Sequence, residues 1–525
     1  MLKGELKSIG IDLGTTYSCV IHRDRDGSET VVESSDGGEL TPSVVHFGVG
    51  DRALVGEEAK RLLGRDPENV VTGIKRQMGS EFPLEFHGRR YTPEGISGII
   101  LRHLATDASQ ALVVPLSDLA AVITVPAYFG VAEKEATYAA AEISGLECLE
   151  VLAEPVAAAY AYGLAHESEI TSLVFDLGGG TFDVAVVGMH RGAPRVWAVD
   201  GETRLGGLDW DSRIQDLLWA QVDTLANAED LRYDEEVMGA VEAASERIKR
   251  QLTGRDSVTE RIRFQGQSIE LRLNRAAFED VSRDLIVRCL DTVGRVIESA
   301  TALGAPPVGQ VLLVGGSTRM PMIRESLRER LGLPVRLTDP DKAVARGAAI
   351  LAEQLVAQSG GGAVTGSRPG LPRPVARITP VLPRSIGILI HSSQEPWREE
   401  PYVHHFIPAN TSLPINRKEH VVATIVNEQE RARIHLYEQG GAVTSKERAD
   451  NRIVLEGEIV GIPPRPAGSP VTLLVSIDLD GRITVESTEG KARTKLEVEA
   501  FIHGVLDDAE LAEQQQVVGA LTLDR

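Results

Sequence analysis

Two short stretches of this chain repeat one pattern, and that repeat limits the possible folds more than any other feature. Each is an apolar run that ends in an aspartate, followed by a turn of glycine and threonine and a second apolar run: IDLGTTYSCV (residues 11–20) and FDLGGGTFDV (residues 175–184). The alternation predicts a strand, a tight turn and a strand in both places. We therefore expect a duplicated fold whose two related halves face each other across a cleft.

The residue types at these turns indicate what the cleft binds. Glycine lacks a Cβ, so its backbone can approach a ligand closely, and successive N–H groups at such a turn bind anions. An aspartate at a strand end, as at Asp12 and Asp176, can hold Mg²⁺, usually through water. Two ordinary tight hairpins are the alternative reading. Thr15, Thr16 and Thr181 favour the phosphate site, because they place hydroxyls at matching positions.

Two further stretches fit the nucleoside of a nucleotide. ERIKRQLT (residues 246–253) has a helical pattern, with Glu246, Lys249, Arg250 and Thr253 on one face. Taken alone, that face reads better as a solvated surface with ion pairs. LLVGGSTRMP (residues 312–321) shifts the balance, because a glycine pair after a strand can lie flat against a nucleoside, and an arginine can stack on a base.

Composition excludes several classes of partner. The net charge of −21 disfavours nucleic acid and anionic membrane surfaces, and no stretch approaches the roughly 20 apolar residues that span a bilayer. The three cysteines, Cys19, Cys148 and Cys289, are far apart and in no CxxC spacing, which is typical of reduced thiols. We expect a cytoplasmic protein.

The 525 residues are too many for one compact core. Helical and strand patterns alternate over residues 1–355, which predicts an α/β unit. Residues 356–378 form a Gly- and Pro-rich linker, and residues 379–500 read as a β-sandwich with strands at 421–426, 432–437, 453–459 and 471–477. Residues 501–525 are polar, weakly helical and too short to hold a core of their own.

Seven motifs in order carry a resemblance: IDLGTTYSCV, VPAYF, EPVAAAYAYGL, FDLGGGTFD, RLGGLDWD, ERIKRQL and VGGSTRMP. The chain resembles the DnaK-type heat-shock chaperone family (heat shock protein 70) over residues 8–355, and residues 380–498 are similar to its peptide-binding β-domain. The resemblance implies an α/β actin-like, duplicated, two-lobed ATPase domain followed by an all-β sandwich.

The resemblance also implies roles for individual residues. Lys75 orients the attacking water and Glu154 lies on the water side of the metal, so that the implied catalytic residues are Lys75, Glu154, Asp176, Thr181 and Asp12. The metal is assigned to Asp12, Asp176 and Asp183. The residues implied to bind ATP or ADP are Gly14, Thr15, Thr16, Tyr17, Lys75, Gly178, Gly179, Gly180, Thr181, Gly207, Glu246, Lys249, Arg250, Thr253, Gly315, Gly316, Ser317, Arg319 and Asp341.

The expected activity is hydrolysis of ATP to ADP with Mg²⁺, with K⁺ as a second candidate cation. Phosphoryl transfer to water depends on positioning and electrostatic stabilisation, and needs no covalent intermediate. No strong general base is evident in the sequence. We therefore expect slow turnover, which suits a timer better than a metabolic enzyme.

The expected partners are extended, unfolded polypeptides and a possible nucleotide-exchange factor. The resemblance points to Ile388, Ile390, Ala432 and Ile434 as apolar peptide contacts, although sandwich core is nearly as good a reading of each. The resemblance also implies a helical lid after the β-domain, which we expect to be truncated here to residues 501–525.

Other departures from the family affect coupling and J-protein docking. The linker lacks a leucine cluster, Gly130-Val131 replaces an Asn-Asp pair used in J-protein docking, and Glu150 occupies a basic position. These departures put J-protein docking in doubt, and also the coupling of the ATPase to peptide binding.

Two other classes of function stay open at this point. A small-molecule kinase on the same fold needs an acidic base beside an acceptor hydroxyl, and residues 380–498 count against it. A non-catalytic or filament-forming nucleotide switch is disfavoured by the intact Asp12, Lys75, Glu154, Asp176 and Thr181.

Overall fold

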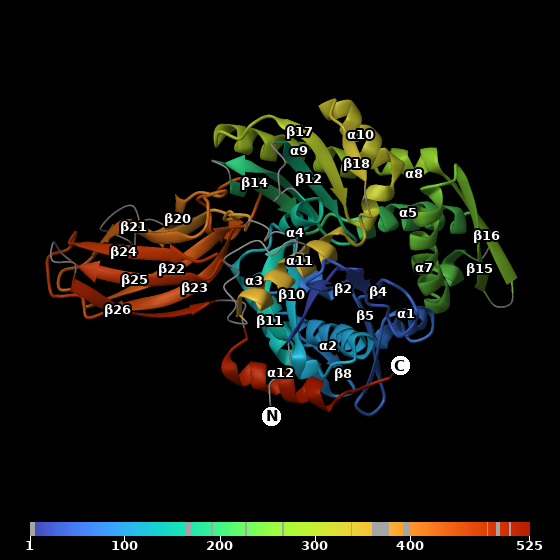
Figure 1. Cartoon of the computed structure of the whole chain (residues 1–525), viewed down its shortest axis with the longest axis horizontal. Helices are drawn as coiled ribbons and strands as arrows, with labels where there is room; N and C mark the ends of the chain where they lie inside the picture. Colours follow the sequence, from blue (N-terminus) through green and yellow to red (C-terminus); the bar gives the residue numbers. More distant parts are fainter. Residues whose placement is uncertain are drawn as a thin grey trace.

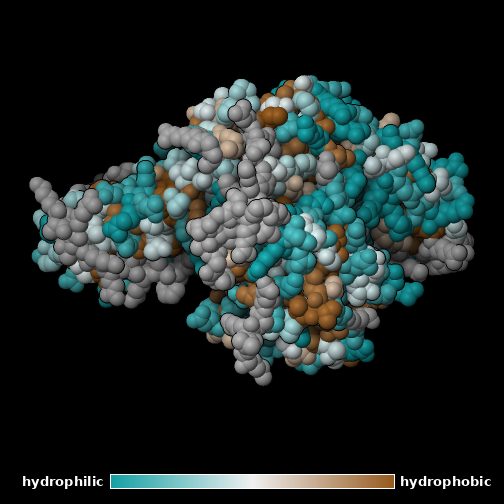
Figure 2. Space-filling view, viewed as in Figure 1, coloured by the Kyte–Doolittle hydropathy of each residue, from teal (hydrophilic) through white to brown (hydrophobic). Residues whose placement is uncertain are grey.

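The computed structural model describes an elongated molecule in which an all-β unit extends from one end of a larger α/β unit (Figure 1). Figure 2 shows the same face in space-filling form, and hydrophilic residues cover most of its α/β end. The described residues are 6–163, 170–190, 193–225, 228–264, 267–337, 339–359, 377–391, 400–479, 481–489, 494–502 and 506–524.

The α/β unit contains two sheets that repeat one strand order. In the first half of the chain (residues 6–163) the order is β11-β10-β1-β2-β3, and in the second half (residues 170–337) it is β18-β17-β12-β13-β14. In both sheets the central strand has a parallel neighbour on one side and its own antiparallel hairpin partner on the other. The two sheets therefore share one strand order and one pattern of parallel and antiparallel neighbours. The strands are β1 (Lys7–Asp12), β2 (Tyr17–Arg23), β3 (Glu29–Val31), β10 (Leu119–Val125), β11 (Glu147–Ala153), β12 (Thr171–Leu177), β13 (Phe182–His190), β14 (Ala193–Glu202), β17 (Val308–Val314) and β18 (Val335–Leu337).

Helices cover both sheets and join them. The helical pattern predicted at residues 246–253 lies at the end of α7. Helix α11 packs so closely on β1 that a Cβ at Gly10 would overlap the backbone of Ala349. The main helices are α2 (Pro93–Leu112), α3 (Val131–Ser144), α4 (Glu154–Ala161), α5 (Gly207–Val222), α7 (Glu235–Leu252), α9 (Arg283–Ala302), α10 (Pro321–Leu331) and α11 (Ala343–Ser359).

Each half also contains shorter elements outside its main sheet. Strands β5 (Val44–Gly48), β6 (Arg52–Val55) and β7 (Val70–Thr72), with helix α1 (Glu57–Arg61), belong to the first half. The hairpin of β15 (Ser257–Phe264) and β16 (Gln267–Asn274) belongs to the second half. The short 3₁₀ helix η3 (Ile74–Gln77) follows β7 and contains the buried Lys75.

The all-β unit is one antiparallel sheet folded over its own core. Its order is β20-β19-β22-β23-β26-β25-β24-β21, and apolar residues of β22 and β24 meet in one cluster. The bounds are β19 (Ile386–Ile390), β20 (Tyr402–Ile407), β21 (Ile415–Ala423), β22 (Arg431–Gln439), β23 (Asn451–Val460), β24 (Pro470–Ile477), β25 (Ile483–Glu489) and β26 (Thr494–Ile502). The strand predicted at 421–426 therefore begins and ends earlier than expected.

The structure describes both ends of the predicted linker. Helix α11 continues to Ser359, beyond the expected start of the linker, and residues 360–376 lie outside the described residues. Ile378 is buried between the two halves of the α/β unit, in one cluster with Val156, Val174 and Val381.

The C-terminal segment returns to the first half of the α/β unit (Figure 1). Helix α12 (Asp508–Ala520) places Val518 and Leu521 in the core of that half, and β27 (Thr522–Leu523) pairs parallel with β6. Nη1 of Arg102 donates a hydrogen bond to the carbonyl of Val518 at 2.8 Å. The sequence indicated a tail too short for its own core, and the structure shows that it shares the core of another unit.

Candidate functional site

A cavity of about 370 Å³ lies between the two halves of the α/β unit. It is lined by most of the residues that the sequence singled out, from both hairpins, the end of α7 and the Gly315–Arg319 turn. Three predicted residues, Gly180, Asp183 and Gly207, do not line it. Leu40, Met320, Pro340 and Val344 were not predicted and add apolar surface to the wall.

The two hairpins have the same register and touch across the cleft. Asp12 pairs with Cys19 in the first, and Asp176 pairs with Asp183 in the second. A Cβ added to Gly179 would overlap Oγ1 of Thr16, and one added to Gly180 would overlap Thr15. Glycine is therefore required at both positions by the close approach of the opposite hairpin.

The N-terminus of α5 supports the second hairpin from behind. The N–H of Gly207 donates to the carbonyl of Gly178 at 2.9 Å, and the N–H of Leu208 donates to the carbonyl of Gly179 at 2.8 Å. A Cβ at Gly206 would lie 2.6 Å from the nitrogen of Gly180. Gly207 thus acts on the hairpin backbone rather than facing the cavity.

A buried ion pair lies at the base of the cavity. Nζ of Lys75 donates to Oε1 of Glu154 at 2.6 Å, and both side chains are nearly inaccessible to water. Lys75 comes from η3 of the first half, and Glu154 opens α4. The pair brings together the two residues to which the sequence assigned the water.

Carboxylates near this pair outnumber the nearby cations. Burial, followed by the charge of Glu154, raises the pKa of Asp12 from 3.8 to about 7. The same two causes raise the pKa of Asp183 to about 8, and burial raises the pKa of Asp176. Oδ2 of Asp176 and Oγ1 of Thr16 are buried without a hydrogen-bond partner in the described chain. This excess of buried negative charge fits a divalent cation.

Within the described ranges, no group of three or more His, Cys, Asp or Glu side chains is close enough to hold a metal directly. Mg²⁺ commonly keeps several waters and is completed by one or two carboxylates and substrate phosphates, so Asp12 and Asp176 fit it in that way. Asp183 differs from the sequence assignment, because its Oδ1 accepts a hydrogen bond from the backbone N–H of Tyr128 at 2.9 Å.

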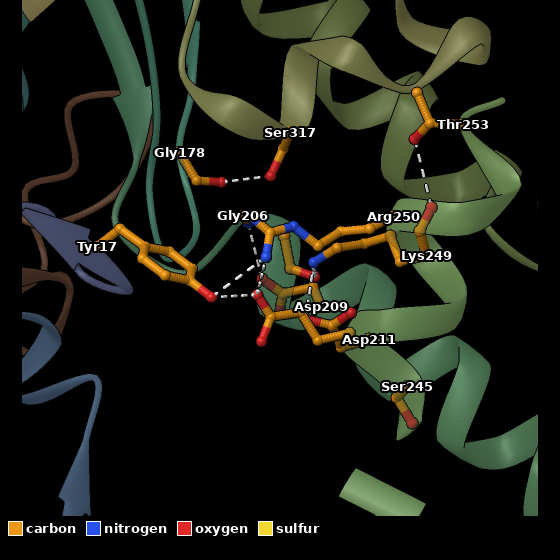
Figure 3. Close-up of polar contacts among 12 residues, drawn as sticks. Tyr17, Gly178, Gly206, Asp209, Asp211, Ser245, Lys249, Arg250, Thr253 and Ser317 are labelled. Atoms are coloured by element: carbon orange, nitrogen blue, oxygen red, sulfur yellow. Dashed lines mark hydrogen bonds and ion pairs between the residues drawn. The ribbon is translucent and has the colours of Figure 1, made fainter. Parts of the chain in front are cut away.

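The end of the cavity beside α7 is closed by contacts between the halves (Figure 3). The hydroxyl of Tyr17 donates to Oε1 of Glu246 at 2.9 Å, and Nη1 of Arg250 donates to that hydroxyl at 3.4 Å. Nζ of Lys60 contacts both Tyr17 and Glu246. Tyr17 of the first half and Glu246 of the second half are therefore joined at the mouth of the cleft.

Other predicted residues are fixed within the second half. Nζ of Lys249 contacts Asp211 at 2.7 Å, and the hydroxyl of Ser317 donates to the carbonyl of Gly178 at 2.8 Å (Figure 3). Arg319 forms an ion pair with Asp341, which joins two residues that the resemblance implied for nucleotide binding.

Besides the four apolar lining residues, the sequence analysis missed two charged residues that reach across the cleft, Lys60 and Arg76. Arg76 directly follows Lys75, and its guanidinium reaches Gly180 and Asp209 of the second half. Neither residue was assigned a role from the sequence, and the contacts of Lys60 with Glu246 and of Arg76 with Asp209 join positions more than 100 residues apart. Only the closed arrangement of the two halves reveals them.

Two of the four predicted peptide contacts belong to the core of the β unit, and the other two pack against it. Ile388 and Ile434 are 4% and 2% exposed, so these two are core side chains in this arrangement. Ile390 and Ala432 are partly buried and pack against the same cluster. The alternative reading of these residues, sandwich core, therefore describes the first two.

The β unit contacts the α/β unit through residues near Gly130. The carboxylate of Glu438 fills the space that a Cβ at Gly130 would need. Nη1 of Arg452 donates to Oε1 of Glu133 at 2.6 Å, and the guanidinium carbon of Arg384 lies 4.3 Å from the ring centre of Tyr128.

A second contact lies where the chain leaves the linker. The Tyr160 hydroxyl accepts from the N–H of Ile378 at 2.9 Å, and Nη2 of Arg377 pairs with Glu150 at 2.8 Å. Thr379 forms a parallel bridge with Arg195 at the edge of β14. Although a leucine cluster is missing, Ile378 and Val381 bury apolar side chains between the two halves.

The chain matches the protein family described as "Hsp70 protein" over residues 8–519. It is 34% identical to the chaperone protein DnaK of Thermotoga petrophila and to that of Thermotoga maritima, over 97% of this chain and 84% of each relative. The DnaK of Thermotoga neapolitana shows the same identity and coverage. The chain therefore belongs to the Hsp70 family.

This protein is accordingly an ATP-dependent chaperone: it hydrolyses ATP and binds segments of unfolded proteins. The kinase and switch alternatives are not favoured. In the part of the chain that the structure describes, no helix combines the length and apolar character needed to cross a bilayer.

Proposed function

We propose that the cavity between the two halves holds ATP or ADP with Mg²⁺, in an actin-like arrangement of two lobes. The observation that carries this proposal is the contact between the two glycine–threonine hairpins, each of which follows a strand-end aspartate. The backbone amides of residues 14–17 and 178–181 would hold the phosphates. The wall that includes Glu246, Arg250 and Arg319 would hold the nucleoside.

The buried Lys75–Glu154 pair is proposed to place the attacking water. Glu154 would accept a hydrogen bond from that water, while the Lys75 ammonium would donate to its oxygen and lie close to the charge that develops on the transferred group. Thr181 and the backbone amides of the glycine hairpin would donate hydrogen bonds to the oxygens of the transferred phosphoryl group. When bound, Mg²⁺ would neutralise phosphate charge, with Asp12 and Asp176 as its nearest carboxylates. The cavity is polar enough that K⁺ could also bind, which a salt series would test.

Single-turnover hydrolysis of ATP tests this proposal directly. We expect slow, Mg²⁺-dependent conversion to ADP by the purified chain. Wild-type turnover in both Lys75→Ala and Thr181→Ala would show that the assigned site is wrong. The exposed Lys7, which pairs with Asp24 far from the cavity, gives a matched control as Lys7→Ala.

We propose that the β unit binds extended apolar peptides at the edge of its core, near Ile390 and Ala432, with Ile388 and Ile434 beneath them. Peptide affinity measured with ATP and with ADP tests the function and the coupling together. A folded β unit without peptide binding would remove this part of the proposal. Equal affinities would mean that the two units do not communicate.

The proposed partners are unfolded polypeptides and a nucleotide-exchange factor. The exchange factor is proposed because Lys60, Tyr17 and Glu246 close the mouth of the cleft, through which the nucleotide would leave. J-protein docking is not proposed, because Glu438 covers Gly130 and Arg377 neutralises Glu150. The cytoplasm is the proposed compartment, which the three free cysteines support.

A further inference from the structure

We propose that Arg76 is a positioning residue that fixes the second phosphate hairpin only when the two halves are closed. The inference rests on the proposed nucleotide site and adds to it a residue that was assigned no role from the sequence. Arg76 lies on η3 of the first half, and its side chain is 20% exposed. Its guanidinium crosses the cleft to the second half.

The carbonyl groups of the glycine hairpin carry the argument. In a trans peptide the C=O of one residue points opposite to the N–H of the next, so a hydrogen bond to the carbonyl fixes the direction of that N–H. The Gly178 carbonyl accepts from the N–H of Gly207 and from Ser317, and the Gly179 carbonyl accepts from the N–H of Leu208. The Gly180 carbonyl accepts from Nε of Arg76 at 2.9 Å. Arg76 thus fixes the peptide plane whose N–H belongs to Thr181.

Arg76 differs from the other donors in the half of the α/β unit to which it belongs. Gly207, Leu208 and Ser317 belong to the same half as the hairpin, so they hold it whether the cleft is open or closed. Among the donors to these three carbonyls in the described chain, Arg76 alone comes from the first half. Opening the cleft would therefore release the Thr181 amide and leave the other two in place.

A second hydrogen bond fixes the guanidinium itself. Nη2 of Arg76 donates to Oδ2 of Asp209 at 2.8 Å, and the same oxygen accepts the N–H of Gly206 at 2.8 Å at the start of α5. The planar fork of arginine can make both contacts at once, whereas a lysine ammonium is a single point charge. Geometry, beyond positive charge, is therefore what residue 76 supplies.

The test compares Arg76→Ala and Arg76→Lys by calorimetry with ADP and with adenosine. We expect both variants to lose about tenfold in ADP affinity, as for one hydrogen bond to a charged group, and to bind adenosine like the wild type. Single-turnover hydrolysis at saturating ATP should fall in both. Arg52→Ala, which removes an exposed arginine of the first half that pairs with Asp524, is the control and should match the wild type.

Recovery of ADP affinity in Arg76→Lys would overturn the inference, because charge alone would then suffice. An equal loss for ADP and adenosine would also overturn it, because the defect would be general. Asp209→Asn keeps a carbonyl acceptor for Gly206, and its effect on ADP should not add to that of Arg76→Ala. Failure of the wild type to bind ADP would instead contradict the proposed function.

Discussion

The carboxylate of Glu438, on strand β22, occupies the space in which a side chain at residue 130 would lie. Glu438 is 1% exposed, and Nη1 of the buried Arg384 lies 3.5 Å from its Oε2. Burial raises the pKa of Glu438, while Arg384 opposes that shift. The absence of a side chain at Gly130 therefore allows the β unit to dock against the start of α3.

Replacing Gly130 by alanine should separate the two units. The φ of Gly130 is −81°, so alanine is compatible with the backbone, and the expected damage comes from the collision with Glu438. We expect a larger radius of gyration by small-angle X-ray scattering and a loss of about 1–3 kcal/mol in the free energy of unfolding. The control is Gly294→Ala in α9, where a Cβ meets nothing within 4 Å. An unchanged radius of gyration would contradict the docking described here.

Removing the Lys75 ammonium should reduce ATP turnover far more than nucleotide affinity. Lys75→Ala leaves the Glu154 carboxylate buried without its 2.6 Å partner and removes the cation that is proposed to direct the attacking water. We expect a fall of about a hundredfold in the single-turnover rate, the size seen for one preorganised donor. The affinity for ADP, measured by calorimetry, should change much less. A loss of affinity as large as the loss of rate would assign Lys75 to binding instead.

The affinity for Mg²⁺ with ADP should rise between pH 6 and pH 8. Asp12 lines the cavity and titrates near pH 7 in the folded protein, so it is largely protonated at pH 6, and a bound cation must displace that proton. Between pH 3.8 and about 7 the folded state binds more protons at Asp12 than the unfolded state does. This carboxyl therefore lowers the stability of the nucleotide-free protein as pH rises through that window.

Calorimetry in buffers of different ionisation enthalpy would count the protons released on binding. Asp12→Asn should release fewer protons and flatten the dependence of affinity on pH, after subtraction of the titration of ADP itself. Equal proton release from the variant and the wild type would exclude Asp12 as the titrating group.

Truncating Leu521 should destabilise the first half of the α/β unit. Leu521 is 4% exposed and belongs to the core cluster that contains Ile96 and Leu104 of α2. Leu521→Ala should lower the free energy of unfolding by about 2–4 kcal/mol, the usual cost of such a cavity. Val443→Ala, at a side chain that is 73% exposed, should have almost no effect. Denaturant melts of both variants give the comparison, and equal melts would mean that the tail does not contribute to this core.

The sequence by itself determined the chemistry of the cleft. Asp12, Thr15, Asp176 and Thr181 sit in short patterns whose strands and turns depend on neighbouring residues, so their placement followed from local rules. The repeated hairpin also predicted the duplicated sheets, because two copies of one motif fold in the same way. Almost every residue assigned to the nucleotide does line the cavity.

Only the tertiary structure decided the contacts between distant segments. Arg76 with Asp209, Gly130 with Glu438 and Leu521 with α2 each join residues that no local pattern relates. The tertiary structure also showed that Asp183 and Gly207 do not line the cavity and that Ile388 belongs to a core. The physical reason is that periodicity specifies which face of an element is apolar or polar, whereas the partner of that face depends on how whole units pack.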